Sequence, residues 1–213
     1  MSQQPVRSFP LFPLGIVALP SESVPLHIFE DRYLRMIEHC LQAPEGSGER
    51  EFGIVWLAED ELKPVGCACE VEHVLDRLED GRLNIVARGT RPFRLLERQH
   101  ELPYPAGVVE FLGDEQESPD DEAQESARAL YRELVLQATE RELEPEELAG
   151  LSVYGMAGTV EFDVADKQKL LELRSENARM RLLAVLLQAA LDRLEMLERA
   201  QVRALSNGKV RFP

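Results

Sequence analysis

The side chains best suited to hold a metal ion are Cys67 and Cys69, with His73 four residues further along. Structural zinc takes four such sulfur and nitrogen ligands, usually from cysteine pairs with two to four residues between them. A Cys-x-Cys pair on a strand points both thiols to one face, where thiols more often fill space in a core. The sequence therefore favours buried thiols over a metal site, and it predicts no cofactor.

Nucleotide hydrolysis and nucleophilic catalysis each leave recognisable motifs, and none occurs in this sequence. A phosphate-binding loop needs a glycine-rich run that ends in Lys and Ser or Thr, but the only Gly-Lys pair, Gly208-Lys209, is followed by Val210. No Gly-x-Ser-x-Gly turn is present for a nucleophilic serine. Members of a catalytic triad can lie far apart in a sequence, so a hydrolase stays an alternative. We expect that the chain is not an enzyme.

Arginines and aromatic residues supply the candidate binding groups. Arg88, Arg91, Arg94 and Arg98 could grip a carboxylate or phosphate, although a solvated face of mixed charge is the more common reason for such a cluster. Three aromatic residues could line a groove for apolar peptide segments, although aromatic side chains fill cores more often than grooves. These three residues are Tyr33, Trp56 and Phe93.

Charge and composition limit the possible partners. The 39 acidic and 24 basic residues give a net charge of −15, which repels phosphate backbones and anionic lipid headgroups. We therefore expect no nucleic acid and no membrane as partner. The chain has three cysteines, no secretory leader pattern at its start and no apolar run long enough to span a bilayer. These features predict a soluble protein located in the cytoplasm.

The first half of the chain predicts a β-rich subdomain over residues 1–113. Its β-branched and aromatic runs predict strands at Ile16–Leu19, Phe52–Leu57, Val65–Val74, Leu83–Ala87, Phe93–Leu96 and Val108–Leu112. Between two of these runs, Asp80-Gly81 predicts a tight hairpin turn, because glycine tolerates the positive φ that such a turn needs. One helix is expected after Glu30 and Asp31, where apolar residues recur at three- and four-residue spacing from Phe29 to Leu41.

The second half predicts a helical subdomain over residues 114–213. Residues 114–125 carry seven acidic residues and no basic one, which indicates a solvated connection. Apolar residues then repeat at helical spacing from Ala123 to Ala138, and Pro145 suits the first position of a further helix. A short helix is predicted over Val153–Val160. A long last helix is predicted from Ser175 as its N-cap to the pair Asn207-Gly208.

Three motifs resemble the signature of the Lon N-terminal domain family. Residues 9–15 read FPLFPLG, residues 24–37 read VPLHIFEDRYLRMI, and residues 79–95 read EDGRLNIVARGTRPFRL. In that family a first strand ends in Phe-Pro-Leu, a Pro-Leu-x-Ile-Phe-Glu segment leads into a helix, and an Asp-Gly-Arg hairpin follows. The helical half of the chain is similar to the family by pattern alone.

The resemblance implies an α+β fold: a PUA-like pseudo-barrel, then a helical bundle with one long C-terminal helix. It also implies binding of unfolded or degron-bearing polypeptides, or of a protein partner, without the ATPase and protease domains of larger relatives. We therefore predict a stand-alone, non-catalytic recognition module. An RNA-binding role by analogy with other PUA-like domains is the alternative, against which the charge argues. The candidate peptide contacts are Pro25, His27, Phe29, Tyr33, Trp56, Arg91 and Phe93.

Overall fold

The computed structural model describes residues 5–44 and 46–207, with residues 201–207 as helical backbone only. Its contacts form two compact units. The first unit comprises the chain up to Gln116 together with Ser152–Ser175, and the second comprises Glu117–Leu151 and the chain from Glu176 onward. The predicted division after residue 113 stays a prediction.

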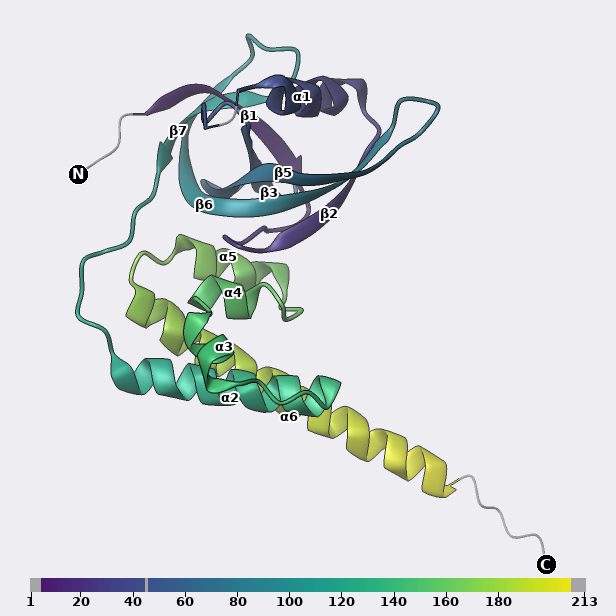
Figure 1. Cartoon of the computed structure of the whole chain (residues 1–213), viewed down its shortest axis with the longest axis vertical. Coiled ribbons are helices and arrows are strands. Elements are labelled where there is room, and N and C mark those ends of the chain that lie inside the picture. Colours follow the sequence, from purple (N-terminus) through teal and green to yellow (C-terminus); the bar gives the residue numbers. More distant parts are fainter. Residues whose placement is uncertain (1–4, 45, 208–213) are drawn as a thin grey trace, which may run out of the picture. The chain divides into compact units, whose positions relative to one another are not determined.

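Five strands of the first unit close into a ring (Figure 1). They are β1 (Val6–Leu14), β3 (Glu51–Ala58), β5 (Val65–Arg77), β6 (Leu83–Gln99) and β7 (Ala106–Phe111). Neighbours in the order β1-β7-β6-β5-β3 pair antiparallel, and β1 then pairs with β3 in parallel, with Leu11 opposite Gly53. This ring, followed by helices, confirms the predicted α+β fold with a pseudo-barrel.

Two short strands extend the ring. Strand β2 (Ser23–Ile28) pairs antiparallel with the first half of β6, from Ser23 opposite Arg88 to Ile28 opposite Leu83. Strand β4 (Glu61–Leu62) pairs with the end of β3, and only Glu59 and Asp60 separate the two strands. Both strands lie off the closed ring and therefore shape its borders.

The barrel core is built around Phe93, which is fully buried. Its ring meets Phe9 edge to face, with the ring centroids 5.3 Å apart. A Cβ atom on Gly53 would lie 2.5 Å from this ring, and one on Gly66 would lie 2.7 Å from it. Glycine at both positions lets the aromatic ring lie directly against the backbone of two strands. The residues of this cluster are Phe9, Leu11, Val55, Ala68, Phe93 and Val109.

The predicted strand Ile16–Leu19 is wrong, because this segment forms no strand. Its last three residues are buried nonetheless. The chain that follows lies against β6, where the amide of Ser21 donates to the carbonyl of Gly89 at 2.8 Å. A Cβ atom on Gly89 would lie only 2.0 Å from the carbonyl oxygen of Leu19. The apolar run thus reflects burial of a loop, which a short run of this kind cannot distinguish from a strand.

The hairpin predicted at Asp80-Gly81 is confirmed. It joins β5 to β6, Gly81 has a φ of 88°, and its amide donates to the carbonyl of Leu78 at 2.9 Å. The predicted strands Leu83–Ala87 and Phe93–Leu96 prove to be parts of one long strand, β6. This strand pairs with β2, β5 and β7 along different parts of its length, so it connects the parts of the first unit.

Three helices belong to the first unit with the sheet. Helix α1 (Asp31–Gln42) confirms the predicted first helix and buries Tyr33, Met36, Ile37 and Cys40. Helices α4 (Val153–Ala157) and α5 (Val164–Glu172) belong to the same unit. Nε2 of the Gln168 side chain donates to the carbonyl of Val65 at 3.1 Å, and Lys167 pairs with Glu22 at 2.5 Å. The short predicted helix therefore exists, ends at Ala157, and is part of the β-rich unit.

The second unit contains α2 (Asp121–Thr139), α3 (Pro145–Gly150) and α6 (Glu176–Asn207). Helices α2 and α6 pack along one another (Figure 1). Asp120 caps α2, where its carboxylate accepts from the amide of Ala123 at 3.1 Å. Pro145 begins α3, as predicted. The predicted stop at Gly208 lies outside the described residues. Across the described chain, every helix is too short or too polar to span a bilayer.

Candidate functional site

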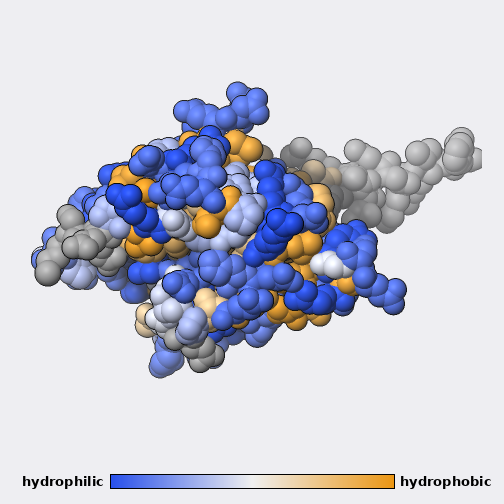
Figure 2. Space-filling view, turned by 90° about the horizontal axis from the view of Figure 1, so that it is seen from above, coloured by the Kyte–Doolittle hydropathy of each residue, from blue (hydrophilic) through white to orange (hydrophobic). Residues whose placement is uncertain are grey.

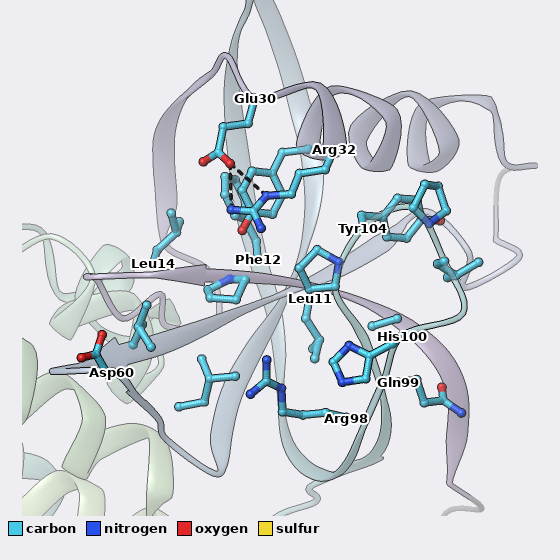
Figure 3. A pocket seen from close by; sticks show the side chains of 18 residues that line it. Leu11, Phe12, Leu14, Glu30, Arg32, Asp60, Arg98, Gln99, His100 and Tyr104 are labelled. Atoms are coloured by element: carbon cyan, nitrogen blue, oxygen red, sulfur yellow. Dashed lines mark hydrogen bonds and ion pairs between the residues drawn. The ribbon is translucent and has the colours of Figure 1, made fainter.

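The first unit carries a groove with a volume of about 680 Å³ (Figure 3). Strand β1, the start of α1, the hairpin between β3 and β4, and the loop between β6 and β7 contribute its walls. The apolar part of the lining is mostly leucine and proline: Leu11, Pro13, Leu14, Leu57, Leu62, Leu102, Pro103 and Pro105. A cavity of this size, lined by leucine and proline side chains among charged and polar groups, could hold a ligand with both apolar and polar parts.

Charged side chains stand on opposite sides of the groove (Figure 3). On one side, Arg32 pairs with Glu30 at 2.7 Å and lies over the ring of Tyr33, 4.6 Å from its centroid. Arg98 and His100 lie on the other side. The groove therefore offers apolar surface between polar groups that could orient a bound segment.

Two tyrosines anchor the groove walls. Tyr33 packs on Phe12, with the ring centroids 4.2 Å apart. The hydroxyl of Tyr104, in the loop between β6 and β7, contacts Nδ1 of His39 on α1. Burial raises the pKa of both Tyr33 and Tyr104. Both phenols therefore stay neutral near pH 7 and act as packing and hydrogen-bonding groups.

A strained turn borders the groove. Glu59 has a φ of 49° and Asp60 a φ of 86°, so two non-glycine residues in succession lie in the left-handed region. Two-residue hairpins favour Asn or Gly at such positions, and each non-glycine residue there costs roughly 1 kcal/mol or more. Asp60 lines the groove. The chain holds an unfavourable backbone conformation at this border, which is common at binding sites.

Three of the predicted contact residues lie together outside this groove. Pro25 and His27 are exposed on β2, and Phe29, which follows it, keeps 61% of its surface exposed. The rings of His27 and Phe29 stack with centroids 5.9 Å apart, and Nδ1 of His27 lies 2.7 Å from Oδ1 of Asn84. They form a small surface along β2, and their binding role stays a prediction.

The other predicted contacts are dispersed. Tyr33 alone lines the groove. Trp56 is half-buried near the β3–β4 hairpin, with Nζ of Lys63 5.7 Å from its ring centroid. Arg91 is partly buried, and Phe93 lies in the core. Because Phe93 does not reach the surface, any effect of this residue on binding must act through the barrel.

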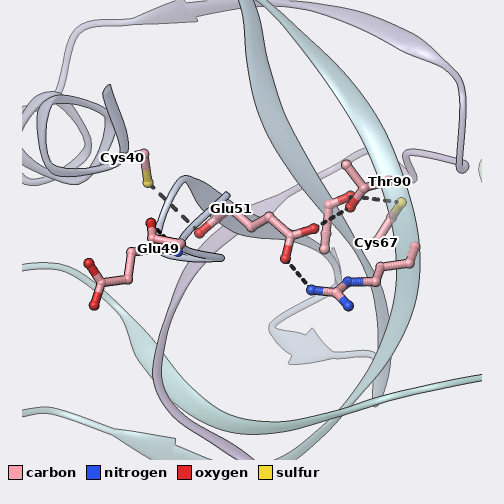
Figure 4. A network of polar contacts seen from close by, with 8 residues as sticks. Cys40, Glu49, Glu51, Cys67 and Thr90 are labelled. Atoms are coloured by element: carbon pink, nitrogen blue, oxygen red, sulfur yellow. Dashed lines mark hydrogen bonds and ion pairs between the residues drawn. The ribbon is translucent and has the colours of Figure 1, made fainter. Parts of the chain in front are cut away.

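Arg91 and Thr90 both contact the buried carboxylate of Glu51. Figure 4 shows the polar contacts around Glu51. Nη2 of Arg91 donates to Oε2 of Glu51 at 2.6 Å, and the hydroxyl of Thr90 contacts the other carboxylate oxygen at 2.7 Å. The Arg91 guanidinium also lies over the ring of Phe111, 3.6 Å from its centroid. Glu51 is buried, and these donors compensate for its loss of hydration. These contacts fix β3 to β6 and leave Arg91 engaged within the fold.

The arginine cluster divides in the structure. Arg88 pairs with Glu72 at 3.1 Å and Arg91 pairs with Glu51, whereas Arg98 lines the groove. The cluster gave the one sequence signal for this side of the groove. Sequence reasoning missed Glu30, Arg32, His100 and Tyr104 as groove residues, because segments distant in sequence bring them together.

The cysteines are all buried and free of disulfides. Burial raises the pKa of Cys40 to about 12 and raises the pKa of Cys67 well above its ordinary value. Such thiols are poor nucleophiles and poor metal ligands, because both roles need the thiolate. In the described part of the chain, no three His, Cys, Asp or Glu residues lie together as a metal site.

The closed five-stranded barrel, its covering helices and the groove define a small β-barrel domain joined to a helical unit. Similarity to known proteins then identifies the family. Residues 8–189 match the family described as the ATP-dependent protease La (LON) substrate-binding domain, and the chain belongs to this family. The match covers most of both units.

Individual relatives agree with this assignment. The chain is 26% identical to Lon protease of Xanthomonas oryzae pv. oryzae over 96% of its own length, and 24% identical to Lon protease 2 of Herpetosiphon aurantiacus over 88%. It spans about a quarter of the length of these relatives, 26% and 24% respectively.

Two solved structures share the fold. The Lon N-terminal domain protein from Xanthomonas campestris has a TM-score of 0.63 and 25% identity, and the match covers 84% of this chain and 98% of that one. The N-terminal domain of Mycobacterium avium complex Lon protease has a TM-score of 0.63, with coverage of 85% and 98%. Its identity of 22% supports the fold alone.

Proposed function

We propose that this chain is a non-catalytic, cytoplasmic recognition module that binds unfolded or degron-bearing polypeptides, or a protein partner that presents such a segment. The groove beside β1 is the observation that carries this proposal. Its leucines and prolines offer apolar contact, and Arg98, His100 and the Glu30–Arg32 pair flank that surface. Unfolded segments expose both backbone polar groups and apolar side chains that folded proteins bury, so a groove with leucines and prolines between charged groups suits them.

The exposed surface of Pro25, His27 and Phe29 supplies a second set of contacts within the same proposal. An exposed aromatic ring next to a strand can pack against an apolar side chain of a client. Nothing in the described structure favours the RNA alternative, and the net charge of −15 argues against it. A titration with structured RNA at low salt tests that alternative directly.

The proposal is tested by comparing a folded protein with its reduced and carboxymethylated, permanently unfolded form as ligands. We expect measurable binding of the unfolded form alone, recorded by fluorescence anisotropy. Leu57→Glu places a charge in the groove and should weaken this binding about tenfold or more. If the unfolded form binds no better than the folded form, the proposed function is wrong.

A matched control separates the groove from a general loss of apolar surface. Leu57 is 39% exposed and lines the groove, whereas Leu96 is 50% exposed on β6 and lies outside its lining. Leu96→Glu therefore makes the same chemical change at a similarly exposed leucine of the same unit. We expect it to change affinity less than about twofold. If Leu57→Glu and Leu96→Glu lose the same affinity for the unfolded ligand, the groove is not the binding site.

A further inference from the structure

Strand β2 is hydrogen-bonded on one side only. It pairs with β6, and no described strand pairs with its other edge in residues 5–44 and 46–207. The amide of Gly89 donates to the carbonyl of Glu22 at 2.9 Å, which marks residues 22 and 89 as a hydrogen-bonded pair. Bonded pairs alternate along an antiparallel ladder. Val24, Leu26 and Ile28 therefore bond to β6, and the residues between them direct their backbone groups outward.

The proline of β2 agrees with this alternation. Pro25 has no N–H, so it fits a position whose N–H would otherwise face away from the ladder. The outward groups are then the amides of Ser23 and His27 and the carbonyls of Ser23, Pro25 and His27. Within the described residues β6 is the strand that β2 pairs with, and all three side chains are exposed. The edge offers donors and acceptors over roughly 14 Å.

We propose that this edge binds an extended polypeptide segment of about five residues as an added β-strand. The inference rests on the proposed function and names how a client is held: by its backbone, with Phe29 as an apolar contact at one end. Backbone pairing tolerates many sequences. It also requires free N–H and C=O groups, which an unfolded chain has and a folded protein has already satisfied.

A second copy of β2 fits this edge poorly. In an antiparallel pair of two β2 strands centred on Pro25, the two prolines face each other, and each Pro25 carbonyl finds no N–H opposite. Proline on an edge strand disfavours self-pairing of this kind. A client strand can place an N–H opposite Pro25, so the unfolded client is the better occupant. The net charge of −15 further favours a client with basic residues.

Two substitutions at one position test the backbone contact. His27→Pro removes the outward N–H, and the extended conformation of Leu26 is the one that a residue before proline prefers. His27→Ala removes the side chain, including its contact with Asn84, but keeps the N–H. With a ten-residue peptide that alternates valine or tyrosine with lysine, we expect His27→Pro to bind at least about fivefold more weakly than His27→Ala. Equal affinities of the two variants would overturn the inference.

N-methylated peptides provide a test that leaves the protein unchanged. Two versions of the same peptide carry N-methyl groups on the odd or on the even residues, so that one blocks the amides facing β2 and the other blocks those facing solvent. We expect one version to lose binding to the wild-type chain and the other to keep it. Equal binding of both versions would show that the backbone amides of the peptide do not contribute to binding.

The outcomes separate this inference from the proposed function. Binding of the peptide with no difference between the two methylated versions or between the two variants leaves peptide recognition intact and refutes strand addition. Absence of binding to any unfolded ligand refutes both. A concentration-dependent dimer that His27→Pro dissociates would assign the edge to a second copy and would also overturn the inference.

Discussion

A single methyl group added at Gly89 should destabilise the first unit by about 3 kcal/mol. The new Cβ atom would lie 2.0 Å from the carbonyl oxygen of Leu19 and 2.8 Å from its carbonyl carbon. Both are backbone atoms, so no side chain can rotate away, and the loop before β2 must move. Overpacking of this kind costs roughly 1–3 kcal/mol. The movement also stretches the two hydrogen bonds of Gly89 with Ser21 and Glu22, each worth about 1 kcal/mol.

Urea unfolding followed by tryptophan fluorescence measures the stability of the unit that contains Gly89. Trp56 is the only tryptophan of the chain and lies in the first unit. For Gly89→Ala the midpoint should fall by about 1 M or more. Gly113→Ala is the control, because a Cβ atom there meets no atom within 4 Å. If the two variants have midpoints within roughly 0.2 M of each other, the loop before β2 accommodates the added methyl group and the predicted loss of stability is wrong.

Four further predictions concern the core, the thiols and the helical unit. Phe93→Ala should cost about 3–5 kcal/mol in urea unfolding, whereas Phe29→Ala at an exposed position should change stability little. None of the three cysteines should react with a thiol reagent at pH 8 until urea is added. Because burial raises the pKa of Cys40 to about 12, stability should also fall as pH rises above about 9, where unfolded thiols ionise. The amide of Ala123 and the guanidinium of Arg181 lower the pKa of Asp120, so its stabilisation of α2 should be lost as pH falls below about 4, as NMR titration can record.

Each of these predictions has an outcome that contradicts it. Equal stability of the Phe93→Ala and Phe29→Ala variants would place Phe93 outside the core. Rapid modification of any cysteine in the native chain would mean that the thiol is accessible. An Asp120→Ala variant whose helical unit unfolds with the same acid dependence as the wild type would show that this carboxylate does not contribute.

Local patterns predicted the elements whose signal is contained in a few neighbouring residues. The turn at Asp80-Gly81 and helix α1 are examples, because a glycine with positive φ and an apolar stripe suffice to specify them. Strands β1 and β2 carry prolines, which lower strand propensity, and the family resemblance rather than propensity indicated the first of them. Pro25 is tolerated because its missing N–H would point away from β6, which a sequence does not state.

The groove could not be predicted as a unit. Tyr33 and Arg98 were noted for different reasons, and only ring closure between β1 and β3 together with the loop after β6 brings their segments to one cavity. Trp56 and Phe93 were grouped with Tyr33 by residue type alone. In the structure, Phe93 lies in the core, Trp56 is half-buried outside the groove lining, and Tyr33 is buried yet lines the groove. The size that suits an aromatic residue to a groove suits it equally to a core, so residue type does not distinguish these positions.

The grouping of Ser152–Ser175 with the barrel makes the path of the polypeptide an interleaved one. The backbone passes between the two units after Gln116, after Leu151 and after Ser175. Each unit is therefore built from two separate stretches of the sequence. A chain cut after residue 113 would leave the barrel without the α5 residues that bond to Val65 and Glu22. A variant intended to contain the barrel alone must therefore delete Glu117–Leu151 and join Gln116 to Ser152, as one deletes a domain that is inserted within another.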